Sequence, residues 1–421
     1  LRRQRQMCIR DREEGDPENH AFSFMSERKD RNKRNCWLTY TNEKTHEIIR
    51  ENIMRAPKYA GKIHGIGARY CPSIEDKVVR FADKDRHQLF VEPEGLDTTE
   101  MYVQGMSTSM PIDVQYAFLR TIPGFEDVKM MRPAYAIEYD LLDPLQLYPT
   151  LEVIKLPGLY SAGQSNGTSG YEEAAAQGLV AGINAALKIQ GKDPFILARH
   201  EAYIGSLVDD LVTKGADEPY RMMTSRSEYR LILRQDNADL RLTEKGHSIG
   251  LVGEERYARF LERKKKYEEA MDYIRTQRFT PKEEINRALE SMGTAPLTTG
   301  TGADQILKRP EMTYRKMMEI LGCPSFDEEA VEEMEITVKY EGYIARQEAA
   351  VRKAARMENE KLPLDMDYLS LDGISTEARQ KMDKIRPLSL GQAARIPGVS
   401  PADISVLMVY VKQRKGKKGA E

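Results

Sequence analysis

The chain has 421 residues, of which 40% are apolar and 31% are charged, and its formal net charge is −2. A chain of this length is too long for one hydrophobic core, so it predicts two or three domains. The balanced charge excludes a protein whose whole surface attracts polyanions, and any contact with nucleic acid must come from local basic patches.

The cysteines are Cys8, Cys36, Cys71 and Cys323, and no pair of them has the spacing of a CxxC motif. Because the histidines are not clustered either, neither a disulfide framework nor a metal site is expected, and a reducing compartment fits. The sequence contains no run of roughly 18 apolar residues, which a membrane-spanning helix would need. With no signal-peptide pattern at its beginning, it predicts a cytoplasmic protein without a membrane segment.

The N-terminal part of the chain divides into two stretches of different character. Residues 1–14, LRRQRQMCIRDREE, are charged and aperiodic, which predicts a disordered or non-native leader. Residues 15–130 alternate strand and helix patterns and predict an α/β domain. A helix that begins after Ser73 is expected to bury Val78, Val79 and Phe81.

Residues 131–215 contain the stretch LYSAGQSNGTSGYEEAAAQGLVAG (159–182), which combines a short apolar strand, a glycine-rich turn and a helix. The helix start leaves backbone N–H groups unpaired, and these donors favour negative or electron-rich groups. Small residues such as Gly178 and Gly182 would let the helix pack closely against a sheet. A ligand site and a tight packing joint without a ligand both fit this pattern, which is neither a P-loop nor a G-x-G-x-x-G fingerprint.

Residues 216–421 carry mostly helical patterns and predict an all-α domain. The last helix is expected to begin after Ser400, with Pro401 and Asp403 in its first turn. One long charged helix, EERYARFLERKKKYEEAMDYIRTQ, has an apolar stripe formed by Tyr257, Phe260, Leu261, Tyr267, Met271 and Ile274.

A basic segment, TSRSEYRLILR, lies near the start of this helical region. Its spacing predicts a helix that presents Arg226, Arg230 and Arg234 on one face. With the neighbouring Arg221 and Arg241, they fit a stripe that binds RNA phosphates. A solvated face, paired with Asp236 and Asp239, fits the pattern equally well.

The stretch GLYSAGQSNGTSGYEEAAAQGLVAGINAA resembles the second flavin-contacting segment of the MnmG/GidA family, the tRNA uridine 5-carboxymethylaminomethyl modification enzymes. From about residue 22 to the basic tail, further motifs fit in the right order: TNEKTH, GARYCPSIEDKVVRFADK, RPAYAIEYD, EPYRMMTSRSEYRLILRQDNADLRL, RPEMTY, VKYEGYIARQ and GQAARIPGVSPADIS. The resemblance implies a Rossmann-like FAD/NAD-binding α/β fold followed by an all-α C-terminal domain. The family's G-x-G-x-x-G unit, which holds the FAD pyrophosphate, has no counterpart here, so the α/β fold is expected to be incomplete at its N-terminal side.

The resemblance also assigns roles to the domains and to individual residues. It makes 15–130 an insertion or NAD(H)-side α/β domain, 131–215 the C-terminal part of the FAD-binding domain, and 216–421 a helical tRNA- and partner-binding domain. The implied FAD contacts are Gly163, Gln164, Asn166, Gly167, Thr168, Gly170, Tyr171 and Glu172. The implied NAD(H) contacts are Gly67, Arg69, Tyr70, Cys71, Pro72, Ser73, Asp76, Lys77, Arg80 and Phe81. The implied tRNA contacts are Arg221, Arg226, Arg230, Arg234 and Arg241.

Cys71 is the candidate catalytic residue. It lies just before an expected helix start, where the helix dipole can lower the pKa of a thiol. Carbon 5 of uridine attacks electrophiles poorly until a nucleophile adds at carbon 6, and a cysteine of this family motif has been proposed for that addition. The alternative is an inert cysteine that packs as a small hydrophobic residue.

As a family member, the protein is expected to use FAD reduced by NADH to pass a one-carbon unit from methylenetetrahydrofolate to carbon 5 of the wobble uridine of tRNA. Glycine or ammonium would complete the group, and the expected partners are tRNA, the MnmE GTPase and a second copy in a homodimer. One alternative is a catalytically inactive fragment that binds tRNA and MnmE. A second is a folate-dependent tRNA uracil-5-methyltransferase, which as a family lacks the long helical domain. A third, an NAD-dependent oxidoreductase, would leave the arginine stripe without a purpose.

Overall fold

The computed structural model describes residues 12–13, 21, 23–26, 34–63, 72–363 and 365–418. The chain forms two compact units. Unit 1 contains the described residues of Leu1–Leu142 together with Gly163–Tyr171 and Ala216–Arg221. Unit 2 contains Asp143–Ala162, Glu172–Gly215 and the described residues of Met222–Glu421.

Unit 1 contains a four-stranded antiparallel sheet in the order β1-β2-β3-β4. Val91 on the third strand lies opposite Trp37 on one side and Val103 on the other, so apolar residues pair across the sheet. The first strand lies within residues 1–14, where the sequence predicts a leader, and its pairing with β2 makes these two residues part of the sheet. The strands are β1 (Arg12–Glu13), β2 (Cys36–Tyr40), β3 (Gln88–Pro93) and β4 (Met101–Gln104).

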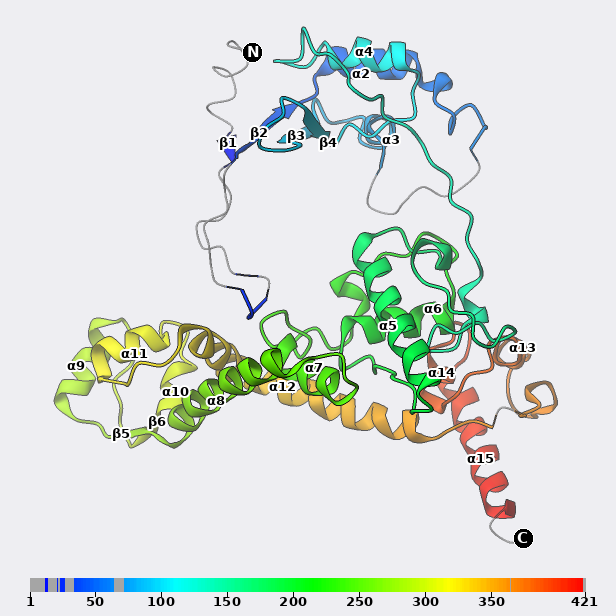
Figure 1. The fold of residues 1–421 in the computed structure, drawn as a ribbon. Helices are drawn as coiled ribbons and strands as arrows, with labels where there is room; N and C mark the ends of the chain where they lie inside the picture. The colour runs from blue at the N-terminus through cyan, green and yellow to red at the C-terminus, as the bar shows by residue number, and fades with distance from the viewer. Residues whose placement is uncertain are drawn as a thin grey trace. The chain divides into compact units, whose positions relative to one another are not determined.

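Helices complete the core of this sheet region. They are α2 (Glu43–Glu51), α3 (Ile74–Arg80) and α4 (Ile112–Leu119), with the short 3₁₀ helix η2 (Ile53–Arg55). α2 packs against α4, which lies beside it, and also against α3 (Figure 1). The buried residues that they share with the sheet include Ile49, Ile74, Val78, Leu89, Val114 and Phe118.

The helix starts follow the sequence signals more closely than the helix faces do. α2 begins with a capping box, in which Asn42 Oδ1 accepts from Thr45 N at 3.0 Å and Thr45 Oγ1 accepts from Asn42 N at 3.1 Å. On α3, Val79 is 45% exposed and Phe81 is 47% exposed, so the prediction that they are buried is wrong. Successive helical residues point about 100° apart, and the side of α3 that reaches the core is that of Val78.

Unit 2 is helical. Its helices are α5 (Tyr171–Ile189, from Glu172 onward), α6 (Tyr203–Lys214), α7 (Ala238–Ser248), α8 (Glu254–Thr276), α9 (Glu283–Ser291), α10 (Ala303–Leu307), α11 (Tyr314–Leu321), α12 (Glu328–Asn359), α13 (Thr376–Ile385), α14 (Leu390–Arg395) and α15 (Pro401–Lys418). Its short 3₁₀ helices are η3 (Pro144–Gln146), η5 (Thr224–Arg226) and η6 (Tyr368–Ser370). The strands β5 (Arg278–Phe279) and β6 (Thr301–Gly302) pair as a two-stranded antiparallel ribbon.

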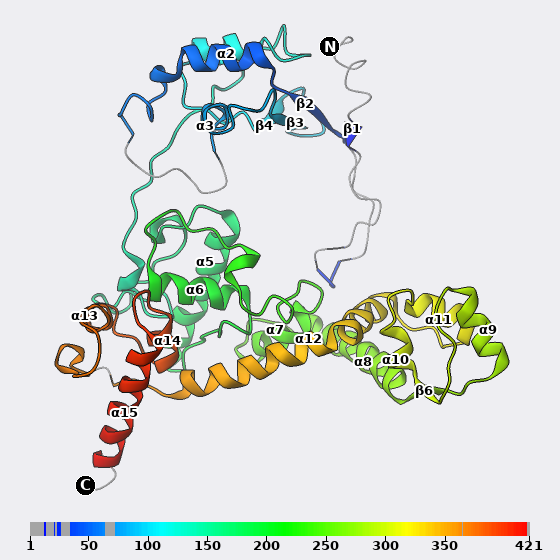
Figure 2. The same ribbon diagram turned by 180° about the vertical axis from the view of Figure 1, so that it is seen from behind.

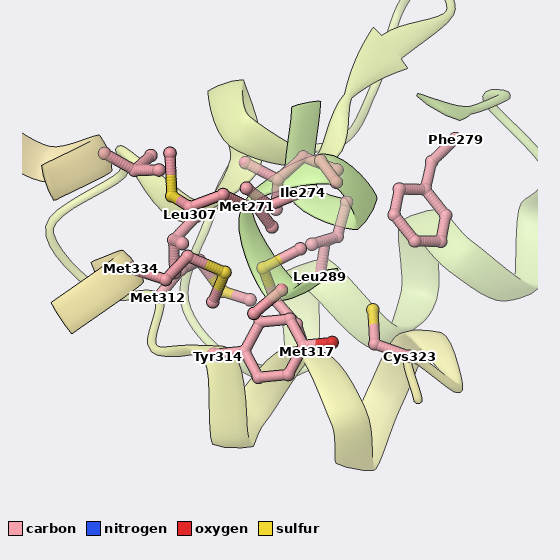
Figure 3. Packing of buried hydrophobic residues seen from close by; sticks show 14 of the residues in the cluster. Met271, Ile274, Phe279, Leu289, Leu307, Met312, Tyr314, Met317, Cys323 and Met334 are labelled. Atoms are coloured by element: carbon pink, nitrogen blue, oxygen red, sulfur yellow. The ribbon is translucent and has the colours of Figure 1, made fainter. Parts of the chain in front are cut away.

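A methionine-rich core holds α8, α10, α11 and the first turns of α12 together (Figure 3). Tyr314 is fully buried at its centre, and its hydroxyl donates to the carbonyl of Pro324 at 2.9 Å. Of the apolar stripe predicted for α8, Phe260 and Ile274 are fully buried, whereas Leu261 is 45% exposed. Leu261 directly follows Phe260, so its side chain points about 100° away from that of Phe260 around the helix axis.

A second core holds the C-terminal bundle of α13, α14 and α15. The predicted start of α15 is confirmed, because Ser400 Oγ accepts from Asp403 N at 3.2 Å and Asp403 Oδ2 accepts from Ser400 N at 2.8 Å. α12 reaches both cores, with Met334 in the first and Met357 against the second (Figure 2).

The fold class agrees with the prediction, since an α/β part is followed by an all-α C-terminal part. None of the helices in the described ranges is long and apolar enough to cross a membrane.

Two leucine substitutions test the core around α8. Leu307 is fully buried, so Leu307→Ala should lower the free energy of unfolding by about 2–5 kcal/mol through lost contacts and a residual cavity. Leu261→Ala is the matched control, because that side chain is 45% exposed and its truncation should cost less than about 1 kcal/mol. Urea denaturation of both variants measures the difference, and equal losses would contradict this description of the core.

Candidate functional site

The glycine-rich stretch forms a compact turn whose backbone is fixed by its glycines. The predicted strand at 159–162 is reduced to an isolated antiparallel bridge between Glu152 and Tyr160. The chain then forms the 3₁₀ helix η4 (Gly163–Asn166), with Gly163 at φ 85° and Gly167 at φ 80°. Both angles lie in the left-handed region, which glycine adopts without the strain that a side chain would add.

Neighbouring segments of unit 1 hold this turn in place. Tyr220 N donates to the carbonyl of Gly167 at 2.8 Å, and Ser169 N donates to the carbonyl of Tyr220 at 3.3 Å. Gln164 Nε2 donates to the carbonyl of Asp140 at 2.9 Å. A Cβ on Gly167 would lie 2.8 Å from the Cβ of Ala216, so this position has no room for a larger residue.

The predicted FAD residues of the turn fall into two groups. Asn166 is fully buried, and Thr168 is 2% exposed with its Oγ1 donating to the carbonyl of Gly163 at 2.9 Å, which is a bond within the turn. Tyr171 is 95% exposed. Between them lies Ser169, whose buried Oγ has no hydrogen-bond partner among the described residues.

This arrangement fits an electron-rich ligand such as a flavin. The first N–H groups of an α-helix have no partner within the helix, and α5 starts at Tyr171, directly after the turn. The orphaned Ser169 hydroxyl adds one more polar group of the kind that a bound ligand satisfies. The sequence pattern did not single out Ser169, although the predicted contacts Thr168 and Gly170 lie on either side of it.

The face of α5 that carries Gly178 and Gly182 is not packed as the sequence predicts. A Cβ on Gly178 or Gly182 would meet no described atom within 4 Å, so the expected close packing against a sheet is absent from the described residues. Leu179 is 46% exposed and Ile189 is 88% exposed. Glu173, which was not a predicted site residue, is 2% exposed, and its Oε1 accepts from Met222 N at 2.7 Å.

The predicted NAD(H) residues are described only in part. Gly67, Arg69, Tyr70 and the candidate catalytic Cys71 lie outside the described residues, and Pro72 is the first described residue of this motif. Ser73 caps α3, with its Oγ accepting from Asp76 N at 3.2 Å, and Lys77 Nζ donates to the carbonyl of Gly105 at 3.2 Å. Arg80 and Phe81 are exposed at the end of α3.

Asp76 is bound within unit 1. Lys58 Nζ lies 2.8 Å from both of its carboxylate oxygens, and the Tyr59 hydroxyl donates to Oδ1 at 2.9 Å. Burial alone would raise the pKa of Asp76, but the hydrogen bonds from Lys58 and Tyr59 lower it below its ordinary value. Burial and the same hydrogen bond raise the pKa of Tyr59 to about 12. Asp76 therefore stays ionised and engaged, and its role toward NAD(H) remains a prediction.

The predicted arginine helix is not formed, so Arg226, Arg230 and Arg234 do not share a helical face. Residues Thr224–Arg226 make one 3₁₀ turn, and Ser227 is extended with φ −99° and ψ 127°. The physical reason is Arg199, whose Nη2 donates to the carbonyl of Arg226 at 3.2 Å. That carbonyl would have to accept from residue 230 in a continuous α-helix.

The predicted tRNA arginines have different environments. Arg230 is exposed and Arg226 is half-buried, whereas Arg221 belongs to unit 1. Arg241 is engaged, with Nε donating to Asn237 Oδ1 at 2.8 Å and Nη1 to the carbonyl of Glu201. Burial lowers the pKa of Arg241, as does the neighbouring charge of Arg234.

Arg234 belongs to a buried charge cluster, of which the sequence indicates only the pairing with the acidic Asp236 that follows it. Its Nε lies 3.0 Å from Asp236 Oδ2, and its Nη2 donates to Glu333 Oε1 at 2.6 Å. Burial and the adjacent Asp236 carboxylate raise the pKa of Glu333 to about 8, against the effect of Arg234. Burial disfavours ionised Asp236, but the neighbouring Glu333 carboxyl group and the charge of Arg234 lower its pKa. Glu333 is therefore the member of this pair that binds a proton near neutral pH, while Asp236 is ionised.

Three family models match the chain. The model of "Glucose inhibited division protein A" matches residues 6–193. The models of the "tRNA modifying enzyme MnmG/GidA C-terminal helical domain" and "C-terminal helical bundle" match residues 254–348 and 350–421.

Curated relatives agree with these matches. The tRNA uridine 5-carboxymethylaminomethyl modification enzyme MnmG of Enterococcus faecalis is 55% identical over 411 residues, which cover 97% of this chain and 65% of the relative. The enzyme of the same name from Caldicellulosiruptor saccharolyticus is 56% identical over 406 residues, covering 96% of this chain and 65% of the relative. The chain thus spans about 65% of the length of the curated relatives that it matches.

Solved structures of Aquifex aeolicus GidA have the same fold. The form I crystal structure has a TM-score of 0.83 at 47% identity and covers 95% of this chain and 65% of that one. The form II structure has a TM-score of 0.79 at 47% identity, with coverages of 91% and 59%. The chain belongs to the MnmG/GidA family.

Two glycine substitutions separate the turn from the helix. Gly167→Ala should lower the free energy of unfolding by about 1–3 kcal/mol, because its φ is 80° and its Cβ would clash with Ala216. Gly178→Ala should raise it by about 0.5–1 kcal/mol, because the position is helical and open. Denaturant titration compares the two, and a loss at both positions would refute the open face of α5.

The carboxyl pair predicts a pH dependence of stability. The folded-state pKa of Glu333 lies above its ordinary value of 4.5, so its contribution to stability is full below pH 4.5 and is lost as the pH rises toward about 8. Glu333→Gln removes this titration, and the variant should gain stability relative to the wild type between about pH 5 and pH 8. Unfolding free energies at both pH values measure the gain.

The matched control for this experiment is Glu332→Gln, since Glu332 is the exposed neighbour on α12. Its stability should follow the pH as the wild type does. If Glu333→Gln kept the wild-type dependence of stability on pH, the raised pKa of Glu333 would be ruled out.

Proposed function

We propose that this protein is a flavin-dependent enzyme that builds the carboxymethylaminomethyl or aminomethyl group on carbon 5 of the wobble uridine of tRNA. The observation that carries the proposal is the 55% identity, over 97% of this chain, to an enzyme named for that modification. Because the chain spans about 65% of that relative, the activity of the whole enzyme is a proposal for this chain.

In this proposal the glycine turn lies against FAD. Bound flavin would accept and donate electrons during transfer of the one-carbon unit. The proposed contacts come from Gln164, the peptide groups near Gly167 and Gly170, and the hydroxyl of Ser169. The unsatisfied Ser169 Oγ and the left-handed φ angles of the turn support this assignment.

NADH and methylenetetrahydrofolate complete the proposed set of reactants. The segment that ends in α3 would bind NAD(H), with the exposed Arg80 near its end available to a phosphate. Cys71 would add to carbon 6 of the uridine, so that carbon 5 becomes nucleophilic, and would leave again once carbon 5 has lost its proton. The exposed Arg230 and the half-buried Arg226 would contact RNA phosphates.

The proposed partners are the MnmE GTPase and a second copy of the chain. The support for both is membership of the family, together with two helical regions that match its C-terminal models.

A reconstituted reaction tests the proposed function. This chain is incubated with tRNA, FAD, NADH, methylenetetrahydrofolate, glycine and an MnmE GTPase, and the wobble nucleoside is analysed by mass spectrometry. Wild type should produce the modified uridine, and Cys71→Ser should reduce the product by at least about 100-fold, as expected for loss of a covalent nucleophile.

Cys36→Ser is the matched control, because Cys36 is a half-buried residue of β2 outside the predicted motifs. It should retain the wild-type rate. Unmodified tRNA with the wild-type chain would contradict the proposed function, and full activity of Cys71→Ser would remove Cys71 from the mechanism.

A further inference from the structure

The middle of α12 carries two exposed aromatic rings. Tyr340 is 47% exposed and Tyr343 is 57% exposed, and their ring centroids lie 6.4 Å apart with the planes tilted by 50°. The Arg346 guanidinium lies 5.5 Å from the centroid of the Tyr343 ring. Because the two rings are tilted rather than stacked on each other, they keep surface for an aromatic partner.

These rings belong to a part of α12 that neither core covers. Met334 and Val338 enter the core around α8, and Met357 packs against the C-terminal bundle. Between them, Gln347 Nε2 donates to the carbonyl of Glu228 at 3.1 Å. This bond joins the middle of α12 to the segment that carries Arg230.

The same part of the helix is basic. Between residues 339 and 356 it has five basic and two acidic side chains. Both acidic residues have a basic neighbour, since Glu341 pairs with Lys308 at 2.6 Å and Glu348 with Arg352 at 3.8 Å. The buried Oε1 of Gln347 has no hydrogen-bond partner among the residues that the structure describes. Aromatic faces beside basic side chains are the combination that binds unpaired nucleotides.

We propose that Tyr340, Tyr343 and Arg346 form a stacking face for unpaired nucleobases of the tRNA substrate. The inference rests on the proposed function and adds the part of the RNA that this surface binds. The tyrosine rings stack on bases, while Arg346 and Arg230, which follows the Gln347-bound Glu228 by two residues, contact phosphates. An acidic protein would use the arginines alone and would leave the two rings without a matching partner.

Binding of two RNA probes to the full chain tests this proposal. One probe is an RNA hairpin with the sequence of a tRNA anticodon stem and loop, and the other is a fully paired RNA of the same length. Tyr340→Ala and Tyr343→Ala should each weaken hairpin binding by about tenfold, as expected for loss of one stacked base, and should leave duplex binding within about twofold. Tyr340→Phe and Tyr343→Phe should bind the hairpin as the wild type does, because the ring is kept.

Tyr135→Ala is the control for loss of an exposed ring elsewhere, since Tyr135 is 73% exposed and belongs to unit 1. Melting curves of all variants exclude unfolding as the cause of lost binding. Unchanged hairpin affinity in the alanine variants, or an equal loss for the duplex, would overturn the stacking face. If the stacking face is overturned but Arg230→Ala weakens binding of both probes, the proposed tRNA-binding function stands without the stacking face. A wild-type chain that binds neither probe contradicts the proposed function itself.

Discussion

The buried guanidinium of Arg199 is the interaction on which the helical unit depends. Arg199 is 7% exposed, and its Nη1 lies 2.7 Å from Asp210 and 3.0 Å from Asp209. A charge this far from water is stable only with opposite charges and hydrogen bonds around it. Asp209 also accepts two hydrogen bonds from Arg395, at 2.6 and 2.7 Å, which fix α14 to α6 across 186 residues of sequence. Matched buried charges, in addition to apolar area, therefore hold the C-terminal bundle in place.

The same guanidinium sets the conformation of the arginine segment. Arg199 binds the Arg226 carbonyl, which in a helix would accept from residue 230, and it also binds the Glu228 carboxylate, so both groups are held by this buried guanidinium. The segment runs through turns instead, which leaves Arg230 exposed and brings the Glu228 carbonyl to Gln347. A stabilising contact in the interior thus determines which basic groups reach solvent beside α12. Local helix propensity is worth a few tenths of a kcal/mol per residue, and a buried ion pair overrides it.

Features set by neighbouring residues could be predicted from the sequence, and features set by distant ones could not. The α/β part, the all-α part and the caps at Ser73 and Ser400 follow from patterns within a few residues. The cluster of Arg234 with Glu333 joins residues 99 positions apart, and no local pattern marks it. Phe260 is buried and Leu261 is not, and the rotation of α8 about its own axis decides which of the two faces the interior. An apolar stripe in the sequence predicts that rotation only to within one residue position.

The glycines of the central stretch lie in two different environments, and only one of them requires glycine. Gly163 and Gly167 have positive φ angles, and bonds from Tyr220 and Gln164 hold the turn around them. Gly178 has an ordinary helical conformation with open space beside it, so nothing in its surroundings requires glycine. The constrained part of the motif is therefore the turn, whose shape is fixed by contacts within the protein. Since a preformed turn loses little conformational freedom when a ligand arrives, more of the contact energy goes into binding.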